Sequence, residues 1–174
     1  MKLKIEKALI RKAKYDDEAF SQVYEMIYRD LYKYALYMLG NQHDAEDIVS
    51  EAVIDIDKGL INLQNESAFL KWVYTILSAK CKRKRMEYLN KHISIDDEEM
   101  KMDFPNQEVD LDIRQDLIKA LYHLSEDERE ILILFYINGY KSREIEEILN
   151  IKSSTVRSKQ KRALEKLKNM MEVG

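Results

Sequence analysis

Apolar residues recur at steps of three and four along most of this chain, which is the spacing that forms one face of an α-helix. In the first half the pattern predicts a helix from Asp16 to Asn41, where Gly40 supplies a natural stop, and a second helix from about Asp44 to Lys58. The stretch from Gly59 to Ser67 is polar and predicts a loop. A third helix is expected to begin near Ser67 and to continue into a run of basic residues.

The second half of the chain predicts several short helices. Ser125 to Glu128 fits a capping box, in which a serine accepts from the backbone N–H three residues later and a glutamate reaches back. The helix that follows is expected to end at Gly139, and another spans about Ser142 to Leu149. A tight turn is expected at Asn150-Ile151, and the last helix begins near Ser153.

Between these halves, residues 93–112 combine weak apolar periodicity with many acidic residues and the only proline, Pro105. Glycine (4) and proline (1) are scarce in the chain, which favours helices over strands. The fold is therefore predicted to be all-α. We expect two small helical domains, residues 1–92 and 113–174, joined by a flexible acidic linker, with a helix-turn-helix in the second domain.

The net charge of −3 hides an uneven distribution along the chain. Residues 70–92 carry a net charge of +6, residues 94–116 carry −7, and residues 152–168 carry +6. Two basic segments thus flank one acidic segment. Clustered lysine and arginine are typical of surfaces that bind nucleic-acid phosphates, so the sequence predicts two candidate phosphate-binding faces.

The segment from Ser142 to Lys168 has the spacing of a helix-turn-helix. Its expected inner faces are Ile145, Ile148 and Leu149 in the first helix and Val156, Ala163, Leu164 and Leu167 in the second, with Ile151 filling the turn. Small hydroxyl residues suit phosphates, and long cationic side chains reach guanine edges. The candidate residues for duplex DNA are Arg143, Ser153, Ser154, Thr155, Arg157, Ser158, Lys159, Lys161 and Arg162. The alternative is an ordinary helical hairpin with a solvated basic face.

Several of these segments resemble the extracytoplasmic-function sigma factors. Region four of that family is resembled by Leu124–Leu132, Phe135–Tyr140, Ile145–Ile151 and Thr155–Ala163. Region 2.2 is resembled by Asp44–Ala52, and regions 2.3 and 2.4 are resembled by Phe69–Ile76 and Lys80–Arg85. The chain departs from the family at Lys141, where a capping serine or threonine is usual, so Ser142 is expected to cap the helix instead.

The resemblance implies that the acidic helix binds core RNA polymerase. The residues that it assigns to the clamp helices of the largest subunit are Asp44, Glu46, Asp47, Ile48 and Glu51. From the residues alone, a solvated acidic face beside a core face is the favoured interpretation, and only the resemblance shifts it towards a polymerase contact. A metal site at His43, Asp44 and Asp47 is disfavoured, because no cysteine or second histidine lies nearby to complete it. The resemblance also implies contact with the flap of the second polymerase subunit and restraint by an anti-sigma factor.

The loop and the basic run that follows are implied to bind the −10 element of a promoter. Family members capture an unstacked base in this loop, and amide side chains suit base edges. The residues are Asn62, Gln64, Asn65, Ser67 and Trp72 for the bases, with Lys80, Lys82, Arg83, Lys84 and Arg85 for the backbone. Trp72 could instead belong to the core, and the cations could be a solvated helix end.

Together these features predict an alternative sigma factor that recognises −35 duplex DNA and melts the −10 element. The alternative is a stand-alone helix-turn-helix repressor or activator. An enzyme is disfavoured, because no phosphate-cradling glycine loop, metal-ligand spacing or partnered nucleophile is found, and no cofactor is expected. A single cysteine, Cys81, expected to be semi-exposed, and the lack of a signal peptide or membrane-spanning segment suit the cytoplasm, where an anti-sigma factor could hold the protein at a membrane.

Overall fold

The structure is a computed structural model that describes residues 4–91 and 111–173. Within these ranges all regular elements are helical, as the sequence predicts. They are α1 (Lys7–Ala13), α2 (Asp17–Leu39), α3 (Gln42–Leu60), the 3-10 turn η1 (Glu66–Ala68), α4 (Phe69–Asn90), α5 (Leu111–Tyr122), α6 (Glu126–Leu132), the π-helical turn η3 (Ile133–Ile137), α7 (Ser142–Leu149) and α8 (Ser153–Val173). The predicted acidic linker lies outside the described residues as far as residue 110.

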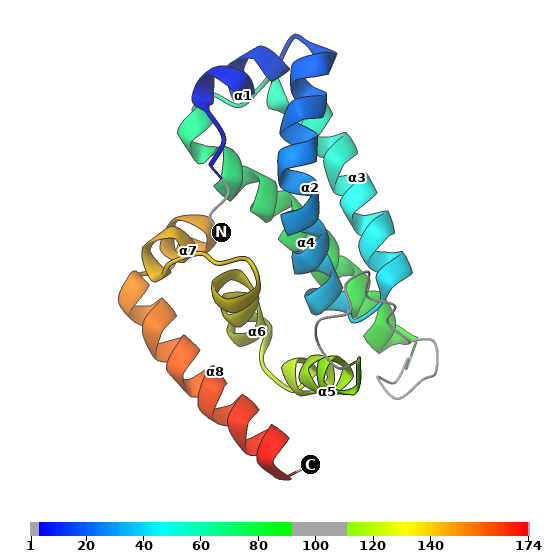
Figure 1. Cartoon of the computed structure of the whole chain (residues 1–174), viewed down its shortest axis with the longest axis vertical. Coiled ribbons are helices and arrows are strands. Elements are labelled where there is room, and N and C mark those ends of the chain that lie inside the picture. The colour runs from blue at the N-terminus through cyan, green and yellow to red at the C-terminus, as the bar shows by residue number, and fades with distance from the viewer. Residues whose placement is uncertain (1–3, 92–110, 174) are drawn as a thin grey trace.

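The N-terminal half, α1 to α4, is built on three long helices that pack along one another (Figure 1). The ends of α2 follow from local chemistry. The side chain of Asp16 accepts a hydrogen bond from the backbone N–H of Glu18, and Gly40 closes the helix with a φ of 68°. The side chain of Asn41 then caps α3 by accepting from the N–H of Asp44 at 2.9 Å.

Helix α1 is an element that the sequence analysis did not identify. Its segment reads as basic and amphipathic, but its seven residues are too few for the helical period to stand out. Ile10 and Ala13 are buried in the core shared with α2 and α3, so an apolar face fixes this short helix in place.

In the C-terminal half, α5 to α8, the predicted capping box is present. Ser125 accepts from the N–H of Glu128, and the Glu128 carboxylate accepts from the N–H of Ser125. The expected turn is also found, because Asn150 adopts a left-handed φ of 56°. The expectation that Ser142 caps α7 is wrong. Ser142 is the first helical residue, and the capping position is held by Lys141, whose N–H donates to Glu144 at 2.8 Å.

The helix-turn-helix, α7 and α8, packs through most of the residues that its spacing predicts. Ile145, Val156 and Ala163 are fully buried, and Ile148 is nearly so. Leu164 is an exception, because 37% of it is exposed. It directly follows the buried Ala163 and is rotated by about 100° from it around the helix axis, so it lies at the edge of the buried face.

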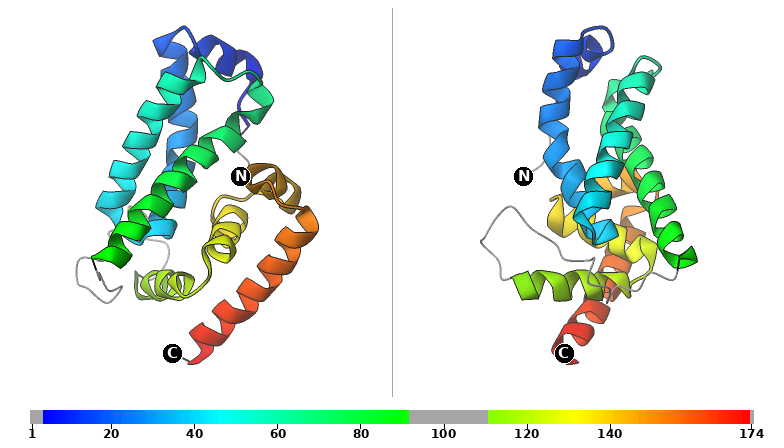
Figure 2. Two further views of the ribbon diagram at one scale, coloured as in Figure 1. Left: turned by 180° about the vertical axis from the view of Figure 1, so that it is seen from behind. Right: turned by 90° about the vertical axis from the view of Figure 1, so that its right-hand side faces the viewer.

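The two halves are in contact. Turn η3 lies against α2, and α7 lies against α4 (Figure 2). Tyr74 and Tyr140 meet edge to face across this contact, with ring centroids 5.6 Å apart, and both are buried. The buried side chain of Asn138 donates to the backbone oxygen of Asp30 at 2.9 Å. A single apolar core therefore continues from the first half into the second.

Cys81 is fully buried on α4, so the expectation of a semi-exposed cysteine is wrong. Burial, reinforced by the Glu130 carboxylate, raises the pKa of its thiol above the ordinary value, although Arg85 and Lys82 act in the opposite direction. In the part of the chain that the structure describes, no helix is both long and apolar enough to span a bilayer.

Candidate nucleic-acid interface

The loop between α3 and α4 presents amide and hydroxyl groups to solvent. Asn62, Gln64, Asn65 and Ser67 are all exposed, as expected for residues that contact a base. Part of their hydrogen-bonding capacity is used within the loop. Asn65 accepts from the N–H of Ser67 at 2.9 Å, and Gln64 donates to the backbone oxygen of Asn62 at 3.3 Å. The loop is thus ordered by its own side chains, with base-edge groups still facing outward.

Trp72 is half-buried on the first turn of α4. It therefore combines the two expectations for this residue, because part of the ring lies in the core and part remains exposed. Its ring packs against the core beside Phe69, with ring centroids 6.3 Å apart. The indole also lies against Gly59 of α3, where an added Cβ would come within 2.8 Å of the ring. One edge of Trp72 is therefore structural, and the remainder is accessible beside the loop.

The basic run on α4 is neutralised by acidic side chains, which the sequence analysis did not foresee. Three of its five cations pair within the N-terminal half. Lys80 lies 2.7 Å from Asp55, Arg83 lies 3.1 Å from Glu51, and Lys84 lies 3.3 Å from Asp44. Only the Arg83–Glu51 pair is largely accessible to water, with side chains 62% and 51% exposed, so this pair contributes little to stability and is easily exchanged for a phosphate. Lys80 is 13% exposed, and Lys84 and Asp44 are 27% and 22% exposed, so these cations are partly withdrawn from solvent.

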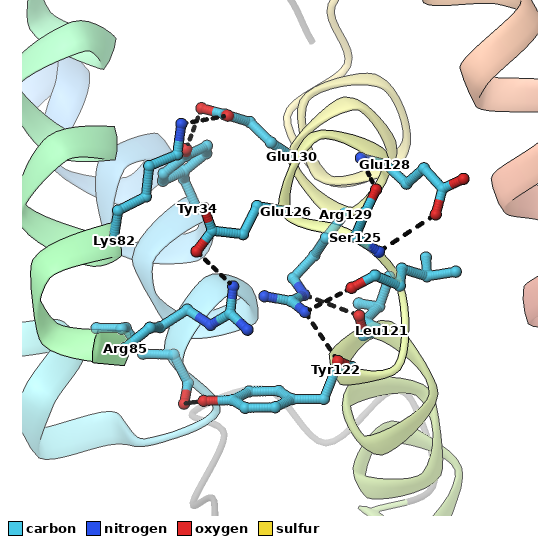
Figure 3. Close-up of polar contacts among 12 residues, drawn as sticks. Tyr34, Lys82, Arg85, Leu121, Tyr122, Ser125, Glu126, Glu128, Arg129 and Glu130 are labelled. Atoms are coloured by element: carbon cyan, nitrogen blue, oxygen red, sulfur yellow. Dashed lines mark hydrogen bonds and ion pairs between the residues drawn. The ribbon is translucent and has the colours of Figure 1, made fainter. Parts of the chain in front are cut away.

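The other two cations of the run pair with the C-terminal half (Figure 3). Lys82 lies 3.4 Å from Glu130, whose carboxylate is only 3% exposed. Arg85 lies 3.1 Å from Glu126 and also stacks on the ring of Tyr122, 5.0 Å from its centroid. Two candidate −10 cations are therefore held in the contact between the halves, and the acids that hold them come from α6.

Arg129 forms the polar centre of the α5–α6 junction, as Figure 3 shows. The side chain is fully buried, and its guanidinium donates to the backbone oxygens of Leu121, Tyr122 and Leu124 at 2.8 to 3.0 Å. It therefore supplies donors to the carbonyls where α5 ends, of which Leu121 also accepts from the backbone N–H of Leu124. Burial, reinforced by nearby Arg85, lowers the pKa of Arg129 to about 10, so the group remains charged at neutral pH.

The acidic residues of α3 divide between surface and internal contacts. Glu46 and Asp47 are exposed, and Glu51 is exposed but pairs with Arg83 and Lys80. Asp44 is engaged by Lys84 and also accepts a hydrogen bond from the hydroxyl of Tyr88. Ile48 is only 4% exposed and packs in the core, so it presents almost no surface in this structure, and its assignment to the polymerase contact stays a prediction.

Helix α8 carries most of the candidate residues for duplex DNA. Ser154, Arg157, Ser158, Lys161 and Arg162 are exposed, as is Arg143 on α7. Ser153 and Thr155 are half-buried at the start of the helix. Lys159 is committed to an ion pair with Asp127 on α6 at 2.6 Å, and this pairing lowers the pKa of Asp127. Among the candidate residues within α8, the exposed cations closest to the start of the helix are thus Arg157 and Lys161.

Lys14 and Glu66 were not among the candidate residues, although they lie at the −10 loop. Lys14 follows α1 and donates to the backbone oxygen of Leu63 and to Glu66. The sequence contained one signal, because Glu66 is an acidic residue in a loop of neutral amides and such a carboxylate often pairs with a cation. The sequence does not show that this cation is Lys14, because only the fold brings the two residues together. Among the residues described, no group of three or more histidine, cysteine or carboxylate side chains could hold a metal ion.

Two family models match this chain. One is described as Sigma-70 region 2 and matches residues 23–88, and the other is described as Sigma-70, region 4 and matches residues 114–167. The matches cover the two helical halves in the order that the motifs predict. Helix α1 and Lys14 lie before the first match.

Curated relatives share this organisation over most of their length. The ECF RNA polymerase sigma factor SigW of Bacillus subtilis is 28% identical over 185 residues, which cover 98% of each chain. The RNA polymerase sigma factor SigV of the same organism is 31% identical over 139 residues, which cover 78% of this chain and 81% of SigV.

Solved structures share the fold. The sigma factor RpoE, in complex with the anti-sigma factor NepR from Bartonella quintana, is 26% identical and matches with a TM-score of 0.69 over 88% of this chain and 97% of that one. CnrH, in complex with the cytosolic domain of CnrY, has a TM-score of 0.73 over 96% and 97% of the two chains, at 19% identity.

Proposed function

This chain belongs to the extracytoplasmic-function sigma factors of the sigma-70 family, and we propose how its two halves divide the work of an alternative RNA polymerase sigma factor. The observation that carries the proposal is that one chain joins a region 2 match to a region 4 match. A stand-alone repressor or activator would need only the helix-turn-helix. The complete N-terminal half therefore favours the sigma factor over that alternative.

The N-terminal half is proposed to open and hold the −10 element. The exposed amides of Asn62, Gln64 and Asn65 would bind a base taken out of the stack, and Ser67 and the free edge of Trp72 would complete the site. The cations of α4 would hold the phosphate backbone. Because Lys82 and Arg85 are paired with α6, their use on DNA would require the halves to separate.

The C-terminal half is proposed to bind −35 duplex DNA through α8. The start of this helix offers Ser153, Ser154 and Thr155 for phosphates, and Arg157 and Lys161 extend beyond them for base edges. The phosphate backbone of the duplex would be contacted by Arg143, Ser158, Lys159 and Arg162. Two weak DNA contacts on one chain would raise each other's effective concentration and so strengthen binding to a promoter that carries both elements.

Core RNA polymerase is proposed to bind the exposed acids of α3, with Glu46 and Asp47 as the principal contacts for the clamp helices. Glu51 and Asp44 would join only after exchanging their internal cations. The flap of the second subunit is the proposed partner of the C-terminal half. In this account the chain supplies promoter choice and strand trapping, and the polymerase supplies the catalysis.

An anti-sigma factor is the remaining proposed partner. RpoE, which resembles this chain in sequence and fold, has been solved in complex with one. We place the protein in the cytoplasm because RNA polymerase acts there, and an anti-sigma partner could hold it at a membrane.

Binding to core RNA polymerase tests the proposal directly. Wild-type protein is expected to co-elute with core polymerase in size-exclusion chromatography, whereas the double variant Glu46→Gln/Asp47→Asn is expected to elute largely alone. The double variant Glu147→Gln/Glu165→Gln is the matched control, because it removes two exposed acids from the other half. Failure of the wild-type protein to co-elute would contradict the sigma-factor function, and retention of the first variant would contradict the assigned contacts.

A further inference from the structure

The polar residues of the −10 loop alternate with residues that face inward. Asn62, Gln64, Asn65 and Ser67 are exposed, whereas Leu63 and Glu66 are half-buried. The side chain of Leu63 packs against the hydrophobic core. The loop is therefore anchored on its inner side at Leu63 and Glu66. The exposed groups that could contact a base lie between these two anchors and on either side of them.

One side chain from outside the loop reaches both of these points. The ammonium of Lys14 donates to the backbone oxygen of Leu63 at 2.7 Å and to the Glu66 carboxylate at 3.2 Å. The side chains of Lys14 and Glu66 are only 10% and 15% exposed. Screening by water and salt is weaker for such a withdrawn pair than for a surface pair such as Arg83–Glu51, whose side chains are 62% and 51% exposed, so the Lys14–Glu66 contact holds its geometry better than that pair.

The Glu66 carboxylate is stabilised in its charged form. Its own backbone N–H and the Lys14 ammonium lower the pKa of Glu66 to about 2, with a further contribution from Arg11. The Arg11 contact is looser, at 3.4 Å and with 65% of the arginine side chain exposed. Lys14 is thus the principal cation behind the loop.

The element that carries Lys14 is itself fixed. Helix α1 buries Ile10 and Ala13 in the core and lies beside the connection between α3 and α4 (Figure 1). Lys14 caps the end of α1, immediately after Ala13, so its backbone has little freedom to move away from the loop. A rigid support therefore connects to the loop through one lysine.

We propose that Lys14 is a positioning residue for −10 recognition, which holds Leu63 and Glu66 so that the amides between and beside them meet an unstacked base in one orientation. This inference rests on the proposed function of the loop. It adds α1, which lies before the region 2 match, to the unit that reads the base. Base discrimination needs fixed donors and acceptors, so loosening the loop would lower the preference for the correct base more than it lowers general affinity for single strands.

A selection from single-stranded DNA tests the inference with the intact holoenzyme. Protein bound to core RNA polymerase is used to enrich a randomised oligonucleotide pool, and affinities are then measured for the enriched sequence and for a scrambled version of it. Wild-type holoenzyme is expected to prefer the enriched sequence. Lys14→Ala is expected to lower that preference by about fivefold, equivalent to about 1 kcal/mol, with the affinity for the scrambled strand unchanged.

One further variant serves as a control, and another tests the same contact from its other side. Lys12→Ala removes a lysine that is 66% exposed and pairs only locally with Asp16, so it should leave the preference intact. Glu66→Gln retains the size of the side chain but removes the charge that Lys14 holds, so it should loosen the loop and lower the preference in the same direction as Lys14→Ala. If Lys14→Ala fails to fold, Glu66→Gln tests the inference instead. It should then lower the preference for the enriched strand and leave the affinity for the scrambled strand unchanged.

The outcomes separate the inference from the function on which it rests. A wild-type holoenzyme that enriches no sequence would contradict the proposed −10 role and the inference with it. A wild-type preference that survives Lys14→Ala, or a variant that loses affinity equally for both strands, would overturn only the positioning role of Lys14.

Discussion

The hydroxyl of Tyr34 on α2 donates a hydrogen bond of 2.5 Å to Oε1 of Glu130 on α6, across 96 residues of chain. Both residues are buried, and Lys82 on α4 approaches the other oxygen of the same carboxylate. One buried carboxylate thus receives a donor from each of two helices in the opposite half. The contact between the halves is specified by this polar cluster as well as by apolar packing.

Removing the Tyr34 hydroxyl should destabilise the folded protein. Tyr34→Phe leaves one side of the buried Glu130 carboxylate without its donor, and we expect a loss of about 1–3 kcal/mol in the free energy of unfolding. Chemical denaturation followed by circular dichroism measures it. Tyr28→Phe is the control, because that ring is 36% exposed, and it should change stability little. Equal stability of the two variants would show that the Tyr34–Glu130 bond contributes nothing net.

Substitution of Arg129 should lower the free energy of unfolding more than substitution of an exposed arginine. Arg129→Leu removes a charged donor from three backbone carbonyls in buried or partly buried hydrogen bonds, and we expect a loss of about 3 kcal/mol in the free energy of unfolding, with fraying at the end of α5. Urea unfolding gives the magnitude, and amide hydrogen exchange across Leu121–Leu124 locates it. Arg29→Leu, an exposed change on α2, is expected to be nearly neutral. A small effect at Arg129 would mean that those carbonyls find other donors.

The contact behind the −10 loop should depend on pH in a defined direction. The pKa of Glu66 falls from an ordinary value of 4.5 to about 2 in the folded state, so its charged form is favoured by folding. Its contribution is therefore fully present above the unfolded pKa and is lost as pH falls from 4.5 towards 2. The difference in Tm between wild type and Glu66→Gln should be constant above pH 5 and should shrink below it. A difference that grows on acidification would contradict the cause assigned to this pKa.

Arg157 on α8 should matter more for duplex DNA than cations farther along the helix. Arg157→Ala is expected to weaken binding to a −35 duplex about tenfold and to reduce the slope of log affinity against log salt by about 1 if the contact is to phosphate. Lys168→Ala is the control, because this residue is 73% exposed but lies three turns farther along α8. Fluorescence anisotropy at several salt concentrations measures both. Equal losses in the two variants would indicate a diffuse charge effect rather than a docked helix.

The sequence predicts the local structure well, because helix signals are local. The Ser125–Glu128 capping box, the left-handed Asn150 and the burial of Ile145, Val156 and Ala163 are all found. Errors arise where one residue decides a boundary or a direction. Lys141 takes the capping position although its side chain cannot accept, because Glu144 supplies the return bond.

The candidate site was harder to predict, because its contacts join distant segments. The resemblance assigned Ile48 to the polymerase contact together with its acidic neighbours, yet this apolar side chain is only 4% exposed and packs in the core. The partners of Lys82 and Arg85 come from α6, some 40 to 50 residues away, and no helical period encodes them. The same is true of Lys14 and Glu66, which are 52 residues apart.

Mapping of transcript start sites with core RNA polymerase on fragmented genomic DNA tests the central claim most directly. Adding the protein should produce new starts that share two motifs, and the variant Arg157→Ala should weaken those starts selectively. No new promoter-specific start on addition of the protein would contradict the account.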